Sequence, residues 1–388
     1  MALKGTNQEF GRPYNRRIVL ESIRLHGPTT RADIAERVGL TVQTVSTIVR
    51  ELDAQGYILS LREQPRGRGP PPATLRINPE GGYAVGLHLT PLGLDAALVN
   101  LRGDVVESVR REAPGASPDH AFALIETLVP ALIGDRARHR ILGVGMALPG
   151  PFGVESMSFV GPTTLAGWQD VALKERLSEA AGLAAFLETD MAAAALGEQL
   201  YGLGTELSHY YYLYFGVGVG GAMVHEGSVM RGAWGNAGEI GHIPAVPDGE
   251  PCPCGNRGCL ERYLSLEALG RHGGDVAGWV ETVAPIFCAA IVTVENLFDP
   301  EAVVLGGLAP PALLERLAAA ASNLPNSVAA RRDRRRPRVM VARGGEHAVL
   351  RGAAALAVSG ALSPRFGQMF AATRERRAEL LAGKEMAA

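Results

Sequence analysis

Three of the four cysteines in this 388-residue chain lie within the eight-residue run CPCGNRGC, and a histidine precedes that run by ten residues. Three thiolates and one imidazole complete the tetrahedral shell of a zinc ion, and the glycines of the run let the backbone turn tightly around it. A disulfide is the alternative, but an odd-numbered cluster is a poor disulfide framework. Because four protein ligands leave no open position, we predict a structural zinc site at His242, Cys252, Cys254 and Cys259.

The net charge of −2 is the sum of two opposite contributions. Residues 1–78 contain 12 Lys+Arg and 7 Asp+Glu, a surplus of +5, whereas the remaining residues contain 26 and 33, a surplus of −7. A basic segment joined to an acidic body is typical of a nucleic-acid-binding module fused to a small-molecule domain. Chance arginine usage gives the same division, so the charge needs support from local patterns.

The composition is that of a globular protein, with 47% hydrophobic and 20% charged residues. Glycine supplies 48 of the 388 residues, well above the roughly 7% of an average protein, and this excess favours tight turns over a helical bundle. No run approaches the ~18 uninterrupted apolar residues of a membrane span. Residues 1–7 lack the features of a secretory signal. We therefore expect a cytoplasmic protein with no membrane partner.

The basic segment carries signals for three short helices. Apolar residues recur at helical spacing between residues 15 and 26. Thr30 and Asp33 form a capping box that opens a second helix, Gly39 can close it in the left-handed conformation, and Thr41 caps a third. Two helices joined by a short glycine-containing turn predict a helix-turn-helix.

The predicted third helix has a polar face opposite its apolar stripe. The side chains of this face are short or planar hydrogen-bonding groups, which suit base edges in a major groove. The candidate DNA contacts on this helix are Thr41, Gln43, Thr44, Ser46, Thr47 and Arg50. A solvated helix face is the alternative interpretation of the same residues.

A wing is predicted after the third helix. Strand-like segments at 56–59 and 73–77 bracket the loop QPRGRGPPP at 64–72. Arg66 and Arg68 alternate with glycine and are held extended by proline, so their guanidinium groups can lie along a narrow minor groove. The loop also suits a flexible interdomain linker. Such a unit rarely binds a long site alone, so we expect a dimer on two half-sites of operator DNA.

From about residue 82 the pattern alternates between strands and helices, which predicts an α/β domain with mixed sheets. The expected strands are 83–89, 94–101, 141–148, 210–215 and 302–305. The expected helices are 118–134, 170–181 and 191–202.

Five sequence blocks of this second part resemble the signature of the ROK family of repressors, open reading frames and sugar kinases. They are ETD at 188–190, GVGVGG at 216–221, GEIGH at 238–242, CPCGNRGCLE at 252–261 and VLGG at 304–307. The resemblance covers roughly residues 82–360 and implies the two-lobed, actin-like or hexokinase-like α/β fold. The segment in front is similar to that of the family's xylose- and N-acetylglucosamine-responsive repressors. We therefore predict a winged helix-turn-helix domain at 1–78 and a ROK-type sugar-binding domain at 79–388.

The resemblance also implies a sugar site. Asp190 matches the residue that takes a proton from the sugar hydroxyl in the family's kinases. Glu239, His242 and Glu261 match ligands of sugar hydroxyls, and His242 would hold zinc through its other ring nitrogen. Gly150 matches a backbone contact. These residue types suit the task because carboxylates accept hydrogen bonds from hydroxyls and a metal-fixed imidazole has a single orientation.

The chain departs from the kinases of the family at the phosphate loop. The kinases have Asp-x-Gly-Gly-Thr where this chain has HLTPL at 88–92. The carboxylate that would manage magnesium is replaced, Pro91 offers no N–H group, and Leu92 replaces the hydroxyl. Thr189 also replaces the Asn that usually precedes the Asp, which removes an amide and leaves the identity of the sugar open. The 216–221 loop fits G-x-G-x-x-G, but the residues after it predict a hairpin instead of the helix that a dinucleotide site needs. We therefore predict neither phosphoryl transfer nor NAD binding.

These patterns predict a sugar-responsive DNA-binding transcriptional regulator, most simply a repressor, that is not an enzyme. Its expected partners are operator DNA and a sugar or sugar derivative, its expected cofactor is structural zinc, and its expected state is a homodimer or a dimer of dimers. The alternative is an ATP-dependent sugar kinase with an appended DNA-binding module. A third reading is a regulator controlled by a partner protein, with a sugar cleft that is no longer used.

Overall fold

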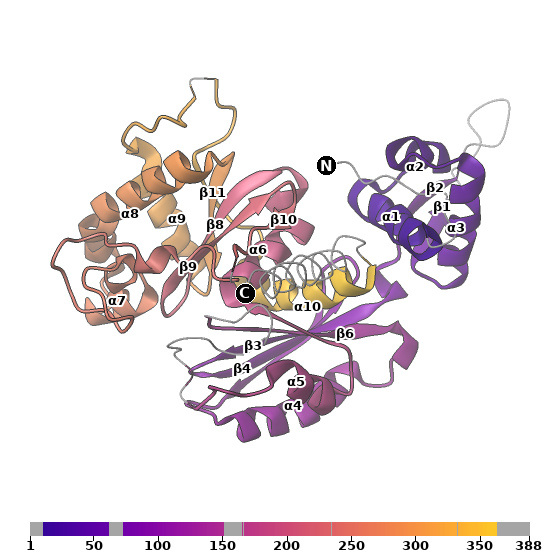
Figure 1. The fold of residues 1–388 in the computed structure, drawn as a ribbon, viewed down its shortest axis with the longest axis horizontal. Coiled ribbons are helices and arrows are strands. Elements are labelled where there is room, and N and C mark those ends of the chain that lie inside the picture. The colour runs from indigo at the N-terminus through magenta and orange to yellow at the C-terminus, as the bar shows by residue number, and fades with distance from the viewer. Residues whose placement is uncertain are drawn as a thin grey trace, which may run out of the picture.

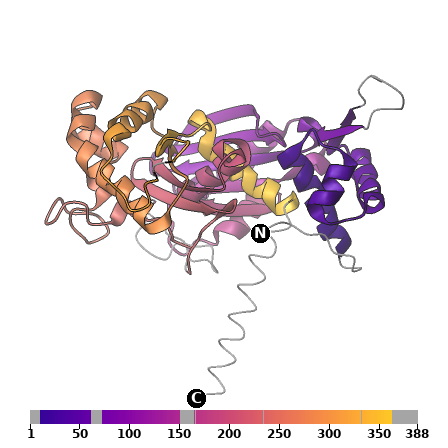
Figure 2. The same ribbon diagram turned by 90° about the horizontal axis from the view of Figure 1, so that it is seen from above.

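The chain is arranged as a small N-terminal head and a larger body of two lobes (Figure 1). The computed structural model describes residues 11–61, 73–150, 165, 167–233, 235–331 and 333–362. Within these ranges each lobe is built on one five-stranded sheet, and the head contains a two-stranded sheet. Seen from above, the head lies at one end of the molecule and the orange part of the second lobe lies at the other (Figure 2).

The head consists of three helices and one strand pair. These are α1 (Gly11–His26), α2 (Arg31–Val38), α3 (Val42–Ala54), β1 (Ile58–Leu61) and β2 (Thr74–Ile77). The predicted capping box is confirmed, because the Thr30 hydroxyl accepts the Asp33 amide and the Asp33 carboxylate accepts the Thr30 amide. Gly39 follows α2 with a φ of 67°, as expected for a left-handed C-cap. Buried aliphatic side chains from all three helices form the core of the head.

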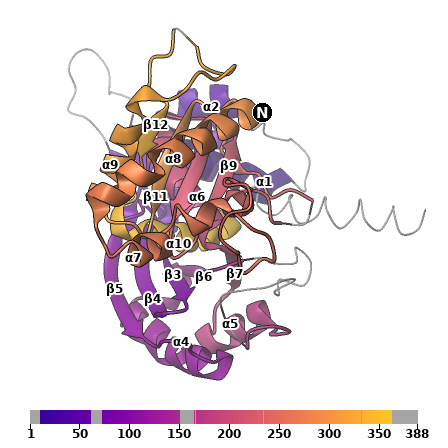
Figure 3. The same ribbon diagram turned by 90° about the vertical axis from the view of Figure 1, so that its left-hand side faces the viewer.

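The first lobe contains a mixed sheet in the order β5-β4-β3-β6-β7. Its strands are β3 (Tyr83–Thr90), β4 (Gly93–Asn100), β5 (Val105–Glu112), β6 (Ile141–Leu148) and β7 (Ala185–Thr189). Helices α4 (Pro118–Ile133) and α5 (Leu173–Ala181) pack on one face through a continuous apolar core. Helix α10 (Ala348–Leu362) packs on the opposite face, so the sheet lies between α10 and the α4–α5 pair (Figure 3).

The second lobe contains a mixed sheet in the order β10-β9-β8-β11-β12. Its strands are β8 (His209–Phe215), β9 (Val219–His225), β10 (Ser228–Val229), β11 (Ala302–Gly307) and β12 (Val339–Val341). The outer face is covered by α8 (Val276–Phe298) and α9 (Pro311–Ala320), and the short α7 (Leu266–Arg271) precedes them. Helix α6 (Asp190–Tyr201) covers the inner face.

Strand β8 shows how the sequence directs this packing. Successive side chains of a strand point to opposite faces of the sheet. Tyr210, Tyr212 and Tyr214 accordingly belong to the apolar cluster that contains α6, whereas the residues between them, such as Tyr211 and Leu213, belong to the cluster that contains α8 and α9. The strand is therefore buried on both faces and carries an almost continuous apolar sequence.

Helices α6 and α10 meet where the two lobes join. A Cβ atom added to Gly352 of α10 would lie 1.8 Å from the Ala193 carbonyl oxygen of α6, and one added to Gly197 would lie 2.8 Å from the Gly352 nitrogen. Real Cβ atoms do not approach other atoms so closely, so glycine at both positions allows the two backbones to touch. Because α6 covers the second lobe and α10 covers the first, this crossing sets the relative position of the lobes.

A buried carboxylate reinforces the same junction. Glu198 of α6 is 1% exposed and accepts a hydrogen bond from the Leu203 amide at 2.9 Å. It also accepts hydrogen bonds from the amides of Arg343 and Gly344, at 2.9 and 3.1 Å, in the segment that leads into α10. A buried charge is tolerated when its hydrogen-bonding capacity is used, and here three N–H donors use it.

Helix α8 is long and apolar enough, by length and composition alone, to cross a membrane. Its buried side chains, among them Val283, Phe287 and Ile291, pack in the core of the second lobe. Its buried Glu295 carboxylate accepts a hydrogen bond from the Arg338 guanidinium, with Nε 2.8 Å from Oε1. The helix thus serves as a core helix of this lobe, and Cys288 is one of its buried residues.

The structure corrects the predicted glycine loop. Residues 216–221 are expected to form one loop, but β9 already begins at Val219, so only residues 216–218 lie between the two strands. The predicted hairpin after the loop is confirmed by the antiparallel pairing of β9 with β10. The predicted helix at 170–181 begins three residues later than expected, at Leu173.

Gly352→Ala should destabilise the protein by about 1–3 kcal/mol, the cost of overpacking a close contact. The matched control is Gly270→Ala in α7, where an added Cβ meets nothing within 4 Å and better helix propensity favours alanine by up to about 1 kcal/mol. Denaturant melts of the two variants should therefore move in opposite directions. Equal midpoints would show that the α6–α10 contact does not limit stability.

Candidate functional site

A cavity of about 480 Å³ lies between the two lobes. Loops from both sheets line it, including those that follow β3, β6 and β8 and the first residue of α6. Ligand sites in α/β folds commonly form at such ends of strands. All five residues predicted for sugar binding line this one cavity: Gly150, Asp190, Glu239, His242 and Glu261.

Asp190 is held in the cavity by the start of α6. The buried Thr189 caps the helix, because its hydroxyl accepts a hydrogen bond from the Ala192 amide at 3.4 Å. Asp190 follows as the first helical residue, and its Oδ1 accepts the Met191 amide at 2.9 Å. Burial raises the pKa of Asp190 to about 6, although the Met191 amide and the Tyr214 hydroxyl oppose this shift. The threonine that stands at position 189 in place of the family's usual asparagine therefore acts as the N-cap of α6.

An ion pair joins the segment before Asp190 to the other lobe. Glu188 precedes Thr189, the last residue of β7, and its Oε2 accepts a hydrogen bond from Arg231 Nε at 2.8 Å. Arg231 lies in the loop between β10 and Glu239, and its carbonyl accepts the Ala237 amide at 3.1 Å. The pair therefore links the strand that leads to Asp190 with the loop that leads to Glu239.

Glu239 and His242 lie on a tight loop that presses against β9. Gly238 has a φ of 105°, and a Cβ atom on it would lie 2.0 Å from the Gly221 carbonyl oxygen. A larger residue would push the loop away from the sheet. Burial raises the pKa of Glu239, while nearby His242 lowers it and the carboxylates of Asp190 and Glu261 raise it further. Three acceptor carboxylates thus face one cavity.

The predicted metal ligands are brought together. One ligand atom from each of His242, Cys252, Cys254 and Cys259 lies within 4.8 Å of the others, and all four cysteines of the chain are free thiols. His242 Nδ1 is 3.6 Å from Cys252 Sγ, and Cys254 Sγ is 3.7 Å from Cys259 Sγ. Bonds of about 2.3 Å to sulfur and about 2.0–2.1 Å to nitrogen give tetrahedral edges close to these separations. The donor set and its spacing therefore fit a zinc ion.

The cysteine loop is shaped by its own backbone. The Cys252 amide donates to the Asn256 carbonyl at 2.8 Å, and the Gly255 amide donates to the Cys252 carbonyl at 3.0 Å. Gly255 has a φ of 95°, a left-handed conformation that glycine adopts without strain. A hydrogen bond from the Asn256 backbone lowers the pKa of Cys254 to about 7, which favours the thiolate form that a metal needs.

Glu261 connects the cysteine cluster to the cavity. Its Oε1 accepts a hydrogen bond from Cys252 Sγ at 3.1 Å and lies 3.6 Å from His242 Nδ1. Since Nδ1 of His242 faces the cysteines, Nε2 is the ring nitrogen left for a ligand in the cavity. The cluster thus sets the position of two of the five predicted sugar residues.

The segment that corresponds to the phosphate loop has a different chemistry from that of a kinase. His88 is 1% exposed, and burial lowers its pKa to about 4, so its imidazole is neutral at physiological pH. Its Nε2 has no hydrogen-bond partner among the described residues. The hydroxyl of Thr90 lies in this turn, but it accepts the Leu92 amide and donates to the Gly93 carbonyl. This turn therefore offers neither a carboxylate nor an uncommitted hydroxyl.

Tyr214 is a cavity residue that the sequence analysis missed. It lines the cavity from β8, and its buried hydroxyl makes no geometrically satisfactory hydrogen bond within the described parts of the chain. Burial raises the pKa of this phenol, and the charge of the neighbouring Asp190 raises it further. The alternating side-chain directions along β8 could have indicated it, because every second residue before the loop at 216–218 points toward α6.

In the head, the predicted DNA-contacting face of α3 is accessible. Thr41, Gln43, Thr47 and Arg50 are exposed, whereas Thr44 and Ser46 are partly buried. The Thr41 hydroxyl caps the helix by accepting the Thr44 amide at 3.1 Å, and the two hydroxyls lie 2.8 Å apart. The Arg50 side chain rests on its own helix, with Nη2 3.3 Å from the Thr47 hydroxyl. Arg66 and Arg68, on the predicted wing, lie outside the described residues.

Comparisons with known proteins match both parts of the chain. Residues 86–281 match the ROK family model, and residues 13–58 match a winged helix-turn-helix DNA-binding model. The chain is 27% identical over 265 residues to the Xylose repressor of Bacillus subtilis (strain 168), which covers 68% of each protein.

Two solved structures share the fold. A ROK family transcriptional regulator, a homologue of the E. coli MLC protein, has a TM-score of 0.72 at 24% identity and covers 92% of this chain and 98% of its own. A ROK family glucokinase from Streptomyces griseus, in complex with glucose and AMPPNP, has a TM-score of 0.62 at 23% identity and covers 72% of this chain and 100% of its own. These similarities confirm the predicted fold class.

Asp190→Asn should stabilise the protein at pH 7.5 by about 1–2 kcal/mol. One pKa unit corresponds to about 1.4 kcal/mol, and the expected gain is smaller than the full shift because water in the open cavity still hydrates part of the charge. Folding raises this pKa, so the ionised carboxylate is penalised above about pH 6 and the penalty fades as the pH falls toward 4. Urea melts at pH 4 and pH 7.5 would measure this difference. Asp119→Asn, at a side chain that is 90% exposed, is the control, and an equal gain at both pH values would contradict the assignment.

Purified protein should contain about one zinc ion per chain, and Cys254→Ser should lose it and unfold at a lower temperature, because structural zinc contributes directly to folding. Cys288→Ser, on α8 and outside the cluster, should retain the metal. Elemental analysis and thermal melts of the two variants make the comparison. Equal zinc content in both would exclude the cluster as the metal site.

Proposed function

The chain belongs to the ROK family, and from its two modules we infer that it is a sugar-responsive DNA-binding repressor without sugar kinase activity. The observation that carries this proposal is a contrast within one cavity. The groups suited to sugar hydroxyls are gathered there, whereas the turn that would hold ATP phosphates has a neutral, buried His88 and no carboxylate. We assign residues 1–78 to DNA binding and residues 79–388 to sugar binding and zinc.

The proposed sugar site uses the carboxylates of Asp190, Glu239 and Glu261 as acceptors for hydroxyl protons. Ionised carboxylates have several acceptor positions and so suit neighbouring hydroxyls of a sugar. Nε2 of His242 and the backbone at Gly150 complete the set. The cavity volume of about 480 Å³ falls within the roughly 300–1,000 Å³ of small-molecule sites. Without a bound nucleotide, Asp190 acts as a hydrogen-bond acceptor instead of a base.

The proposed zinc ion is structural. His242, Cys252, Cys254 and Cys259 would fill its coordination shell, and its chemistry is to hold the loop that presents His242 and Glu261. Loss of the metal is therefore expected to impair sugar binding before it impairs the head, which has its own core.

The proposed DNA site is the exposed face of α3. Gln43, Thr47 and Arg50 are the residues best placed to reach base edges, with Thr41, Thr44 and Ser46 along the same helix and Arg66 and Arg68 on the wing. A single recognition helix covers a short site, so we propose a homodimer, or a dimer of dimers, on a two-fold operator. The cytoplasm is the proposed location because sugar and operator meet there.

The alternative of a working sugar kinase draws support from the glucokinase likeness and from Asp190. Phosphoryl transfer needs groups that hold the phosphates and their magnesium ion. In this chain Pro91 lacks the N–H group, and the Thr90 hydroxyl is engaged with the backbone of its own turn. These observations favour the repressor.

A coupled ATP assay with D-xylose, D-glucose and N-acetylglucosamine tests the proposal, together with calorimetric titration of the same sugars. We expect saturable binding of at least one sugar and no sugar-dependent ATP turnover. Asp190→Asn should weaken binding by about tenfold or more, because removing a charged hydrogen-bond partner costs about 1.5–3 kcal/mol, while Asp119→Asn should not. ATP turnover that depends on sugar and disappears in Asp190→Asn would establish the kinase instead.

A further inference from the structure

The head is attached to the first lobe through the segment that joins them. Asn78 follows β2, and its side-chain amide donates to the Gly56 carbonyl of the head at 2.7 Å. A Cβ atom on Gly81 would lie 2.4 Å from that same carbonyl oxygen, so the two backbones are in direct contact. Tyr57 and Ile77 pack against the apolar cluster that α10 shares with the first-lobe sheet. These contacts make the base of the head a continuation of the first lobe.

A second attachment joins the head to α6, the helix that covers the second-lobe sheet. Arg24 of α1 donates from Nη1 to the carbonyl oxygen of Leu200 at 3.3 Å, at the last turn of α6. Its Nε and Nη2 bind the Glu21 carboxylate at 2.9 and 2.8 Å, and its side chain is only 8% exposed. The last carbonyls of a helix lack intrahelical donors and carry partial negative charge, so a guanidinium is a suitable partner for them.

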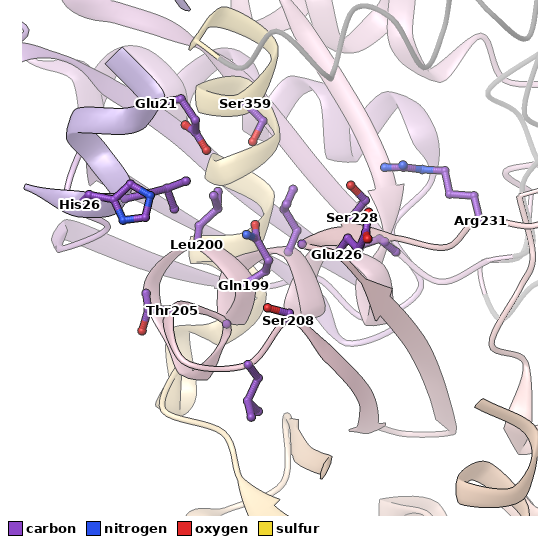
Figure 4. A pocket seen from close by; sticks show the side chains of 16 residues that line it. Glu21, His26, Gln199, Leu200, Thr205, Ser208, Glu226, Ser228, Arg231 and Ser359 are labelled. Atoms are coloured by element: carbon purple, nitrogen blue, oxygen red, sulfur yellow. The ribbon is translucent and has the colours of Figure 1, made fainter. Parts of the chain in front are cut away.

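The interface around this second attachment contains a cavity. A cavity of about 370 Å³ lies between α1 and the second-lobe elements (Figure 4). Glu21 and His26 line it from the head. On the other side, Gln199 lies on α6, Ser208 directly precedes β8, and Ser228 lies on β10. Close-packed interfaces resist sliding, but a cavity leaves room for α1 to move against the second lobe.

Helix α6 has one end at each site. Its first residue, Asp190, lines the proposed sugar cavity, and its last turn, at Leu200, receives Arg24. At 1.5 Å per residue, its 12 residues span about 18 Å. The head is therefore fixed to the first lobe at its base and to α6 at α1. Because Gly197 and Glu198 hold this end of α6 at the junction with α10, a change in the angle between the lobes turns α6 about that end. A head attached both to the first lobe and to α6 is then tilted by the turn.

We propose that Arg24 is the positioning residue through which a sugar in the cavity reorients the DNA-binding head. This inference rests on the proposed function, and it names the contact that carries the signal. A ligand shifts a conformational equilibrium only by its differential affinity for the two states. If Arg24 is removed, the sugar still changes the angle between the lobes, but the orientation of the head then depends only on its attachment to the first lobe.

The first test needs no ligand. Fluorophores introduced as unnatural amino acids at Glu36 on α2 and at Val328 in the second lobe, both exposed, report the distance between the head and that lobe. Single-molecule energy transfer should give a narrow distance distribution for the wild type and a broader one for Arg24→Ala. The variant Glu21→Gln with Arg24→Met removes both charges of the pair together and should broaden the distribution likewise. An unchanged width in both variants would overturn the proposal.

The second test measures coupling. The DNA is a duplex selected by the wild type from a random pool, and the sugars are D-xylose, D-glucose and N-acetylglucosamine. A bound sugar should change the wild-type DNA affinity by about 5- to 150-fold, the usual range of coupling between sites. In both Arg24 variants the change should fall below about twofold, with sugar affinity by calorimetry unchanged.

The control for both tests is Arg176→Ala, which removes another arginine–carboxylate pair (Arg176 Nη2 to Asp119 Oδ1, 2.9 Å) in the first lobe, between α5 and the start of α4. It should behave as the wild type does. Full retention of the sugar effect in the Arg24 variants would overturn the proposal. Failure of the wild type to bind any of the three sugars would instead count against the proposed function, and the distance measurement would still decide the role of Arg24.

Discussion

The close contact between α6 and α10 is the constraint on which the rest of the body depends. Gly197 and Gly352 let the two backbones touch, and each helix covers the sheet of a different lobe. The position of the proposed sugar cavity follows from this contact, because α6 begins at Asp190 on the edge of that cavity. The lobes therefore share a joint made of backbone and small side chains, which leaves little freedom for sliding but allows rotation.

Local signals made much of the fold predictable. The capping box at Thr30 and Asp33 and the strand at 141–148 depend on neighbouring residues, and both occur as expected. Helix α10 was missed because it is enriched in alanine and buried between elements of both lobes, so it lacks the single apolar stripe of a surface helix. Strand β5 was missed because most of its side chains are exposed, which removes the alternation that marks a half-buried strand.

The candidate site was predictable where residues share a motif and unpredictable where they meet across the fold. The GEIGH segment and the cysteine run indicated the metal ligands and two of the carboxylates. Tyr214 could be recognised as a cavity residue only once the structure placed β8 beside α6. The contact of Arg24 with Leu200 joins residues 176 positions apart, and no local pattern could indicate it. The relatives agree with the predicted regulatory function more closely than with the kinase alternative.

The buried Glu198 carboxylate has a mechanical consequence. It accepts hydrogen bonds from three amides, one just after α6 and two in the connection that leads into α10. Breaking these hydrogen bonds would leave a buried carboxylate without partners, which is costly. The two segments therefore stay together when one lobe moves against the other. The junction can then turn without coming apart, so a ligand that acts as we propose would change an angle between rigid parts and leave their internal packing intact.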